Sequence, residues 1–343
     1  MNIPSQTDEL RAVLQADIYD TTVQRFFDQY ESVGCLDEYM NILGGLSTDA
    51  QEMVLSAQVT QVHKEKALWP VFIARGQGLD VHRAVQIGAA TEMLWGLSTI
   101  VDDLLDNDSE RNGKPSEWFR LGRTQVKEKA GDVLKAILKY LSEQVDPLVA
   151  SAGYEYVNWG VDSIGRHHKM SFDTPESDLL WNYIARDSFH TYLPVEALAS
   201  PMYWTGEAKQ ILNSLRLGLT LFNQAGQIAN DMSDMKSSKS KPARLNDLRE
   251  GHCTVASITL YNLVSDEAKC ILRRLYGVHR EYTYYERNTL MEIINNQSFV
   301  ESISRRIIDT YKRGYNLLAP CLNDEDTAMV DSWILYKTAR YRQ

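Results

Sequence analysis

The sequence has few cysteines, and their arrangement does not suggest a metal site or a disulfide framework. Cys35, Cys253, Cys270 and Cys321 lie far apart, with no Cys-x-x-Cys pair and no Cys/His spacing typical of zinc ligands. A chain of 343 residues is long enough to fold around a core without disulfides. We therefore expect free thiols and a reducing compartment, which points to the cytoplasm.

Long apolar runs and an excess of positive charge are also missing. No run of about 18 apolar residues occurs, and residues 1–6 do not open a basic-then-apolar signal. Acidic residues outnumber basic ones by 46 to 36, so the formal net charge is −10. That balance disfavours sequence-independent binding to nucleic acid. We expect no transmembrane segment and no nucleic-acid partner.

What the sequence does contain is helical periodicity along nearly its whole length. No strand-length alternation, low-complexity segment or short repeat interrupts this pattern, and composition does not change abruptly anywhere. We therefore predict one all-α domain over residues 1–343. The expected helices span residues 8–33, 48–75, 80–107, 117–145, 151–171, 177–200, 205–235, 252–264, 266–297, 298–318 and 324–340.

The helix expected over 80–107 is apolar almost all the way round and ends in three aspartates. Asp102 and Asp106 are four residues apart and share a helix face, and Asp103 is next to them around the turn. Buried carboxylates must be paired, protonated or bound to a cation. Oxygen ligands in this arrangement suit Mg2+, which completes its shell with water and substrate phosphate. A solvated acidic helix end is the alternative reading of the motif alone.

A second acidic cluster ends the helix expected over 205–235. Asn230 and Asp234 are four residues apart, with Asp231 beside them. If the two helix ends face each other across a bundle, their carboxylates would repel one another strongly in a partly dry cavity. Several Mg2+ ions and the diphosphate that they bind would relieve this repulsion.

These motifs carry a family resemblance. The stretch Asp-Asp-Leu-Leu-Asp followed by Arg111 and Gly-Lys-Pro, then Gln-Ile-Ala-Asn-Asp-Met-Ser-Asp, Lys241-Pro242 and Asp-Leu-Arg-Glu-Gly, resembles the trans-prenyl diphosphate synthases. The resemblance implies an all-α class I isoprenoid synthase bundle around a central cavity. It also implies three Mg2+ ions, a homodimer, and ionisation of an allylic prenyl diphosphate to a carbocation.

Site residues follow from the resemblance by position. The implied metal ligands are Asp102, Asp103, Asp106, Asn230, Asp231 and Asp234. Four of them, Asp102, Asp103, Asp106 and Asp231, are also expected to be catalytic. Asn230 departs from the family, which usually has Asp there. The residues implied to bind the allylic diphosphate are Arg111, Arg186, Gln227 and Lys241.

The half of the site that holds isopentenyl diphosphate in the family is different here. Of the family's Gly-Gly-Lys-Arg-x-Arg-Pro motif, Lys66 is kept, while Ala67 and Trp69 replace the two arginines. Trp95 stands in place of a His or Gln, and Asn112 in place of a second Arg. A charged hydrogen bond contributes about 1.5–3 kcal/mol, so losing three weakens diphosphate binding by orders of magnitude. The two tryptophans either line the vacated pocket or belong to the core.

Two other positions allow two readings each. Ser98 lies one turn before the aspartates, where bulky aromatics close the pocket of short-chain family members. It implies room for a farnesyl or longer chain, or else it serves helix packing. Arg166-His167-His168-Lys169 stands where the family has Gln-x-x-Asp, or is a basic surface patch. The other histidines, including His252 and His279, form no ligand spacing and are expected to be structural.

Three functions remain open. The first is a prenyltransferase that ionises a farnesyl or longer diphosphate and passes the chain to an unknown acceptor, not isopentenyl diphosphate in the usual way. The second is a terpene cyclase, because cyclases begin their second metal motif with Asn-Asp. The later Ser and Glu of that cyclase motif are not in place. The third is a regulatory subunit of a synthase, which would not need both metal motifs. We favour the first.

Overall fold

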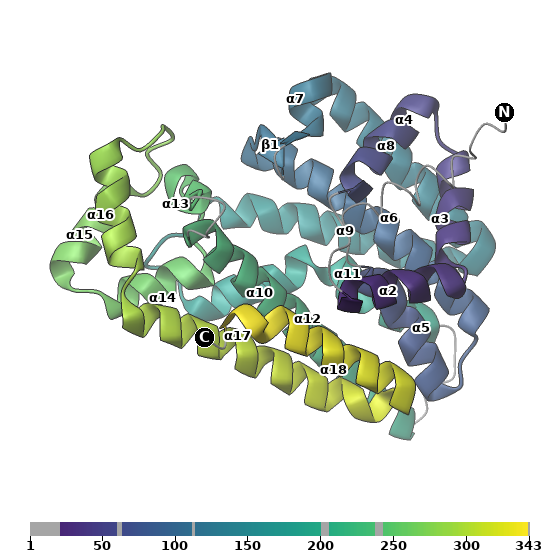
Figure 1. The fold of residues 1–343 in the computed structure, drawn as a ribbon. Coiled ribbons are helices and arrows are strands. Elements are labelled where there is room, and N and C mark those ends of the chain that lie inside the picture. The colour runs from purple at the N-terminus through teal and green to yellow at the C-terminus, as the bar shows by residue number, and fades with distance from the viewer. Residues whose placement is uncertain (1–20, 60–63, 112–113, 200–205, 237–242, 342–343) are drawn as a thin grey trace. The chain divides into compact units, whose positions relative to one another are not determined.

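The computed structural model describes residues 21–59, 64–111, 114–199, 206–236 and 243–341, and these are almost entirely helical (Figure 1). The predicted all-α class is confirmed. The strands found in these ranges are β1 (Glu110–Arg111) and β2 (Lys114–Pro115), which pair antiparallel. Within the same ranges, none of the helices has the length and apolar character needed to cross a membrane.

The chain divides into two compact units. Unit 1 comprises Met1–Tyr156, Tyr192–Leu212 and Cys321–Trp333, and unit 2 comprises Val157–Thr191, Asn213–Pro320 and Ile334–Gln343. Five elements contribute residues to both units: α9 (Pro147–His167), α11 (Ser188–Ala199), α12 (Gly206–Met235), α18 (Asp324–Thr338) and the 3-10 turn η2 (Ala319–Cys321). The prediction that residues 1–343 form a single domain stays a prediction.

Unit 1 is built around α6 (Val81–Asp106). The other helices of unit 1 are α2 (Thr21–Ser32), α3 (Cys35–Gly44), α4 (Thr48–Val59), α5 (Glu65–Gln77), α7 (Glu117–Leu121), α8 (Arg123–Tyr140) and the π-helical turn η1 (Leu141–Val145). Helices α3, α4, α5, α7 and α8 all pack on α6, which is buried on every side from Ala84 to Leu94. This burial agrees with its uniformly apolar sequence.

Both ends of α6 are set by local sequence. At the start, the Asp80 carboxylate accepts hydrogen bonds from the backbone N–H groups of His82 and Arg83, at 2.9 and 3.2 Å. At the end, Asn107 adopts a left-handed conformation with φ 58°, and its N–H donates to the Asp103 carbonyl. Asn tolerates this conformation better than most residues do. The helix therefore ends at Asp106, the third aspartate of the motif.

Unit 2 is organised around α14 (Val255–Leu263). Its other elements are α10 (Glu176–Arg186), α13 (Asn246–Glu250), α15 (Asp266–Leu275), α16 (Tyr284–Ile294), α17 (Gln297–Leu318) and the 3-10 turn η3 (Ala339–Tyr341). Helix α14 packs on α10, α15 and α17. It begins with a reciprocal capping box between Thr254 and Ser257, which satisfies the first backbone N–H groups. Figure 1 shows α13 to α17 in green to yellow-green.

Several expected helices are broken in the structure. The helix expected over 117–145 ends at Leu121 and restarts at Arg123, because Gly122 between them has φ 86°. The ranges 177–200 and 266–297 each hold two helices, separated at Asp187 and at 276–283. Pro70 lies inside α5, which runs from Glu65 to Gln77.

Candidate active site

The first acidic cluster closes α6 in unit 1. Asp102 and Asp106 are both half-buried and lie one turn apart, whereas Asp103 is buried. The helix holds these two half-buried carboxylates on one face, at a spacing that lets both contribute oxygen ligands to a cation. This donor set fits a hard divalent ion such as Mg2+.

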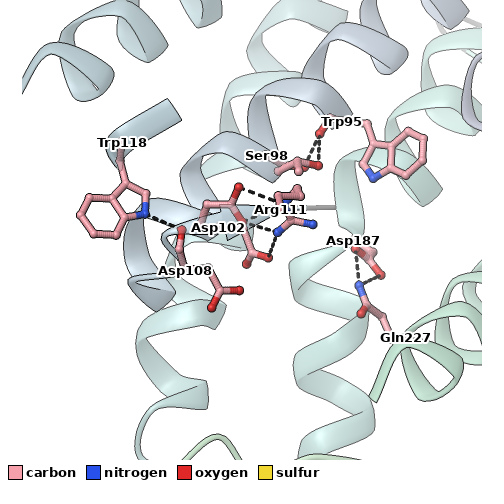
Figure 2. Close-up of polar contacts among 10 residues, drawn as sticks. Trp95, Ser98, Asp102, Asp108, Arg111, Trp118, Asp187 and Gln227 are labelled. Atoms are coloured by element: carbon pink, nitrogen blue, oxygen red, sulfur yellow. Dashed lines mark hydrogen bonds and ion pairs between the residues drawn. The ribbon is translucent and has the colours of Figure 1, made fainter. Parts of the chain in front are cut away.

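The carboxylate of Asp103 is bound by Arg111 of strand β1, the arginine labelled in Figure 2. The Arg111 Nε donates to both carboxylate oxygens of Asp103, at 2.8 and 2.9 Å, and a terminal nitrogen also donates to Oδ1. The same guanidinium lies 3.7 Å from Asp102. Burial raises the pKa of Asp103 to about 6, and the positive charge of Arg111 opposes this rise. Asp103 thus orients Arg111 beside the rest of the cluster.

The loop that carries Arg111 is fastened to α6 and α7. The Trp118 indole N–H donates to the Asp108 carbonyl at 2.8 Å, as Figure 2 shows. Arg123 donates to the Leu104 carbonyl at 2.9 Å and to the Asn107 side chain at 2.7 Å. These bonds satisfy polar groups at the end of α6 and hold the turn in one place. None of these anchors was predicted from the sequence.

The positions that differ from the family pattern are largely closed to solvent. Ala67 is fully buried, and a Cβ on Gly88 of α6 would lie 2.2 Å from its carbonyl oxygen. Trp69 is 3% exposed and packs edge-on against Phe72. Lys66 is half-buried, with its ammonium 5.9 Å from the centre of the Trp95 ring. Asn112 lies outside the described residues.

A buried ion pair lies beside these positions. The Lys64 ammonium is 2.7 Å from the Glu92 carboxylate, and both side chains are almost completely buried, at 1% and 0% exposure. The Lys64 ammonium also lies over the Tyr30 ring, at 5.6 Å. Burial raises the pKa of Glu92, and the charge of Lys64 opposes this. The pair ties the start of α5 to the middle of α6.

Ser98 is half-buried on α6, where its hydroxyl donates to the Trp95 carbonyl at 2.8 Å (Figure 2). This bond is the usual way for a helical serine to satisfy its hydroxyl. The role of Ser98 in setting chain length stays a prediction.

The second acidic cluster closes α12 in unit 2, and its members differ in exposure. Asn230 is exposed, whereas Asp231 and Asp234 are buried. The Tyr183 hydroxyl donates to Asp231 at 2.6 Å and accepts from the backbone N–H of Val255 at 3.1 Å. Burial raises the pKa of Asp231 to about 7, while the Tyr183 hydrogen bond and the charge of Arg186 oppose this. A cation close to Asp231 would favour its charged form.

Asp234 anchors the chain that follows the cluster. Its carboxylate accepts the backbone N–H of Asp247 at 3.2 Å and lies 3.5 Å from the Arg244 guanidinium. The N–H groups of Arg244 and Leu245 donate to its backbone carbonyl. Asp234 therefore shapes the return to α13, and Asn230 is the cluster member most open to solvent.

Of the other residues implied to bind the allylic diphosphate, Gln227 and Arg186 lie within the described part of the chain. The Gln227 amide lies 3.3 Å from the buried carboxylate of Asp187 (Figure 2). Arg186 is half-buried at the end of α10, close enough to Asp231 to influence its charge. Lys241 lies outside the described residues. Tyr341 is buried, and its hydroxyl donates to the Ala229 carbonyl at 3.3 Å.

Sequence reasoning missed several of these partners. Glu92 is a charged residue inside the apolar run of α6, and that contrast was a visible signal for a buried pair. Tyr183 and Asp187 belong to no motif, and nothing local marks them as partners of Asp231 and Gln227. Their roles depend on how α10 and α12 pack.

Comparison with known proteins identifies the family. The polyprenyl synthetase family model matches residues 51–294, and the chain belongs to this family. A search of curated proteins found no significant sequence match.

Solved structures share the fold at low sequence identity. A polyprenyl synthase from Caulobacter crescentus CB15, complexed with calcium and isoprenyl diphosphate, has a TM-score of 0.77 and 16% identity, covering 93% of this chain and 98% of its own. A geranylgeranyl pyrophosphate synthase from Lactobacillus brevis has a TM-score of 0.77 and 13% identity, covering 94% and 100%. A geranylgeranyl pyrophosphate synthase from Corynebacterium glutamicum, complexed with isoprenyl diphosphate and magnesium, has a TM-score of 0.66 and 15% identity, covering 98% and 100%.

Proposed function

We propose that the protein ionises a farnesyl or longer allylic diphosphate with Mg2+ and transfers the prenyl chain to an acceptor. The acceptor is not isopentenyl diphosphate bound in the manner usual for the family. Membership of the polyprenyl synthetase family supports prenyl chain chemistry. The calcium and magnesium complexes of the two similar synthases with isoprenyl diphosphate support a divalent ion and this substrate class.

The metal and diphosphate residues implied by the family resemblance would carry the ionisation step. Asp102 and Asp106 would hold Mg2+, with Asn230, Asp231 and Asp234 as proposed ligands from the second cluster. Bound Mg2+ would neutralise the negative charge that builds on the departing diphosphate. Arg111 would bind the diphosphate, held in position by Asp103. Arg186, Gln227 and Lys241 are proposed to complete the diphosphate site.

The transfer step needs an acceptor with an available electron pair. The allylic C–O bond breaks with its electrons on the diphosphate, and the acceptor's pair forms the new bond to the allylic carbon. The acceptor then loses a proton. Water must be kept from the cation while this happens.

The observation that favours an unusual acceptor is the chemistry around Lys66. The alanine and tryptophans at positions 67, 69 and 95 lack the charged groups that a second diphosphate requires. Lys66 is in contact with the Trp95 ring, and the neighbouring Lys64 is paired with buried Glu92. The half-buried Trp95 ring suits an apolar or aromatic acceptor better than it suits a diphosphate.

The deciding experiment is incubation with geranyl, farnesyl and geranylgeranyl diphosphates and Mg2+, with and without isopentenyl diphosphate. Products are identified by mass spectrometry, and released diphosphate is measured. We expect no chain elongation with isopentenyl diphosphate, and turnover once a cell extract supplies an acceptor. A longer prenyl diphosphate would instead identify an ordinary synthase.

A variant pair tests the ionisation step itself. Asp102→Ala should lower diphosphate release on the order of 1,000-fold, because it removes a ligand for the charge-neutralising ion. Asp132→Ala, at an exposed acidic residue of α8, should have no effect. Equal activity of Asp102→Ala and wild type, or activity unaffected by a chelator, would refute the assignment.

A terpene cyclase is the second candidate. The observation that favours it is that the exposed member of the second cluster is Asn230. A hydrocarbon or alcohol formed from farnesyl diphosphate without any second substrate would establish a cyclase. The homodimer implied by the family resemblance is also a proposal, and light scattering coupled to size-exclusion chromatography tests it.

A further inference from the structure

Three histidines of unit 2 gather where α9 ends and where the chain turns into α14. His252 Nε2 and His168 Nδ1 lie 3.1 Å apart, and their rings meet nearly edge-to-face. The His167 ring stacks against His252, with centroids 5.8 Å apart. His252 is buried and His168 is exposed, so the pair has one fixed member and one that solvent reaches.

His252 is held in place from both sides. Its backbone N–H donates to the Asp247 carbonyl at 2.7 Å. The next carbonyl, of Cys253, accepts a hydrogen bond from His167 Nε2 at 2.6 Å. A carbonyl oxygen only accepts, so Nε2 of His167 carries the hydrogen and is not available as a ligand. A ligand positioned in advance in this way binds an ion at a lower entropic cost.

The distance between His252 Nε2 and His168 Nδ1 matches the distance expected between two nitrogens that bind one metal ion. With metal–nitrogen bonds of about 2.0–2.1 Å, two imidazoles on one ion have nitrogens about 2.9 Å apart at a right angle and about 3.3 Å apart at a tetrahedral angle. The observed 3.1 Å lies between these values. We propose that His168 and His252 form a binding site for a borderline divalent transition-metal ion such as Zn2+, Co2+ or Ni2+.

The nitrogen ligands of this site favour different metal ions from those that the carboxylate clusters favour. Imidazole nitrogen prefers Zn2+, Co2+ and Ni2+, whereas Mg2+ prefers oxygen. Burial, together with the nearby positive charges of His167 and His168, lowers the pKa of His252 to about 4. Arg186 acts in the same direction, and Glu250 opposes it. The neutral form of an imidazole has one ring nitrogen with a lone pair to donate to a metal ion.

A bound ion would join the end of α9 to the loop between α13 and α14, both within unit 2. Water or another ligand would fill its remaining coordination positions. The two proposed ligands, His168 and His252, are not among the residues assigned to the diphosphate or to Mg2+.

The test uses the full-length protein, stripped with a chelator and then kept in excess Mg2+ to occupy the carboxylate sites. Titration with CoCl2 is followed by visible absorption, which reports nitrogen ligation, and titration with ZnCl2 by calorimetry. We expect one ion to bind, with a rise in the melting temperature. His168→Ala and His252→Ala should each weaken binding by about 100-fold or more.

Two controls make the outcome specific. His279→Ala, at an exposed histidine that pairs with Glu250, should bind the ion as wild type does, and so should Asp102→Asn. Wild-type binding that is absent, or that survives in both His168→Ala and His252→Ala, would overturn the proposal. If His252→Ala fails to fold, the exposed His168 position decides the question alone.

Discussion

The guanidinium of Arg111 is bound to the carboxylate of Asp103, with Nε 2.8 and 2.9 Å from its two oxygens. The pair joins the last turn of α6 to strand β1, on the far side of the turn at Asn107. The two aspartates that begin the motif therefore have different surroundings. Asp103 is buried and binds this guanidinium directly, while Asp102, 3.7 Å from the same guanidinium, and Asp106 are more exposed.

The first prediction concerns this pair. Asp103→Asn should weaken binding of an allylic diphosphate by releasing Arg111 from its position, and Arg111→Gln should weaken it directly. Because both changes act through one contact, the double variant should be less impaired than the sum, with a coupling of about 1–3 kcal/mol. Calorimetric titration of all four proteins with a non-hydrolysable farnesyl diphosphate analogue measures this. Strict additivity would mean that Asp103 does not position Arg111.

The second prediction concerns the buried pair of Lys64 and Glu92. Lys64→Ala should reduce the free energy of unfolding by about 3–5 kcal/mol, because it leaves a carboxylate in the core without its cation. Lys64→Met combined with Glu92→Leu should recover most of this loss. Urea denaturation followed by circular dichroism provides the values. Lys135→Ala, on an exposed pair of α8, should change stability by less than about 1 kcal/mol.

The third prediction concerns Tyr183, whose hydroxyl links Asp231 to the start of α14. Tyr183→Phe should cost about 1–3 kcal/mol of stability, since a buried acceptor and a buried N–H both lose their partner. Tyr285→Phe, at a tyrosine that is 78% exposed, is the matched control and should be neutral. Thermal unfolding of the two variants side by side provides the comparison. Similar melting temperatures would show that the hydroxyl contributes little.

The fourth prediction concerns pH. The pKa of His252 is about 4 in the folded state because of burial and the charges of His167 and His168, against about 6.5 when unfolded. As pH falls below 6.5 the unfolded chain takes up the proton first, so stability is lost down to about pH 4 and is fully present above 6.5. The loss is on the order of 3 kcal/mol.

His252→Gln should remove this part of the pH dependence. The measurement is urea denaturation of both proteins between pH 7 and pH 4, in a chelator so that no metal contributes. Parallel pH profiles for the two proteins would contradict the assignment of this effect to His252.

Local patterns in the sequence were sufficient for the helical class and for α6 in particular. Its apolar periodicity, the N-cap at Asp80 and the stop at Asn107 all lie within one window, and the predicted span of 80–107 differs little from the observed Val81–Asp106. The two acidic clusters could be identified for the same reason, because residues four apart on a helix share a face whatever surrounds them. Breaks at Gly122 and Asp187 were missed, because helical periodicity continues across them.

Only the tertiary structure decides which charged group faces which. Lys64 and Glu92 are 28 residues apart, Tyr183 and Asp231 are 48 apart, and His168 and His252 are 84 apart. No local pattern encodes these partners, because they depend on helix packing and on the paths of loops. The first motif was therefore readable as a candidate metal site from residues 102–106 alone. Two other facts depend on the tertiary structure: Asp103 binds Arg111, and Asn230 is the exposed member of the second cluster. Folding decides both, because it determines the burial and hydrogen bonding of each side chain.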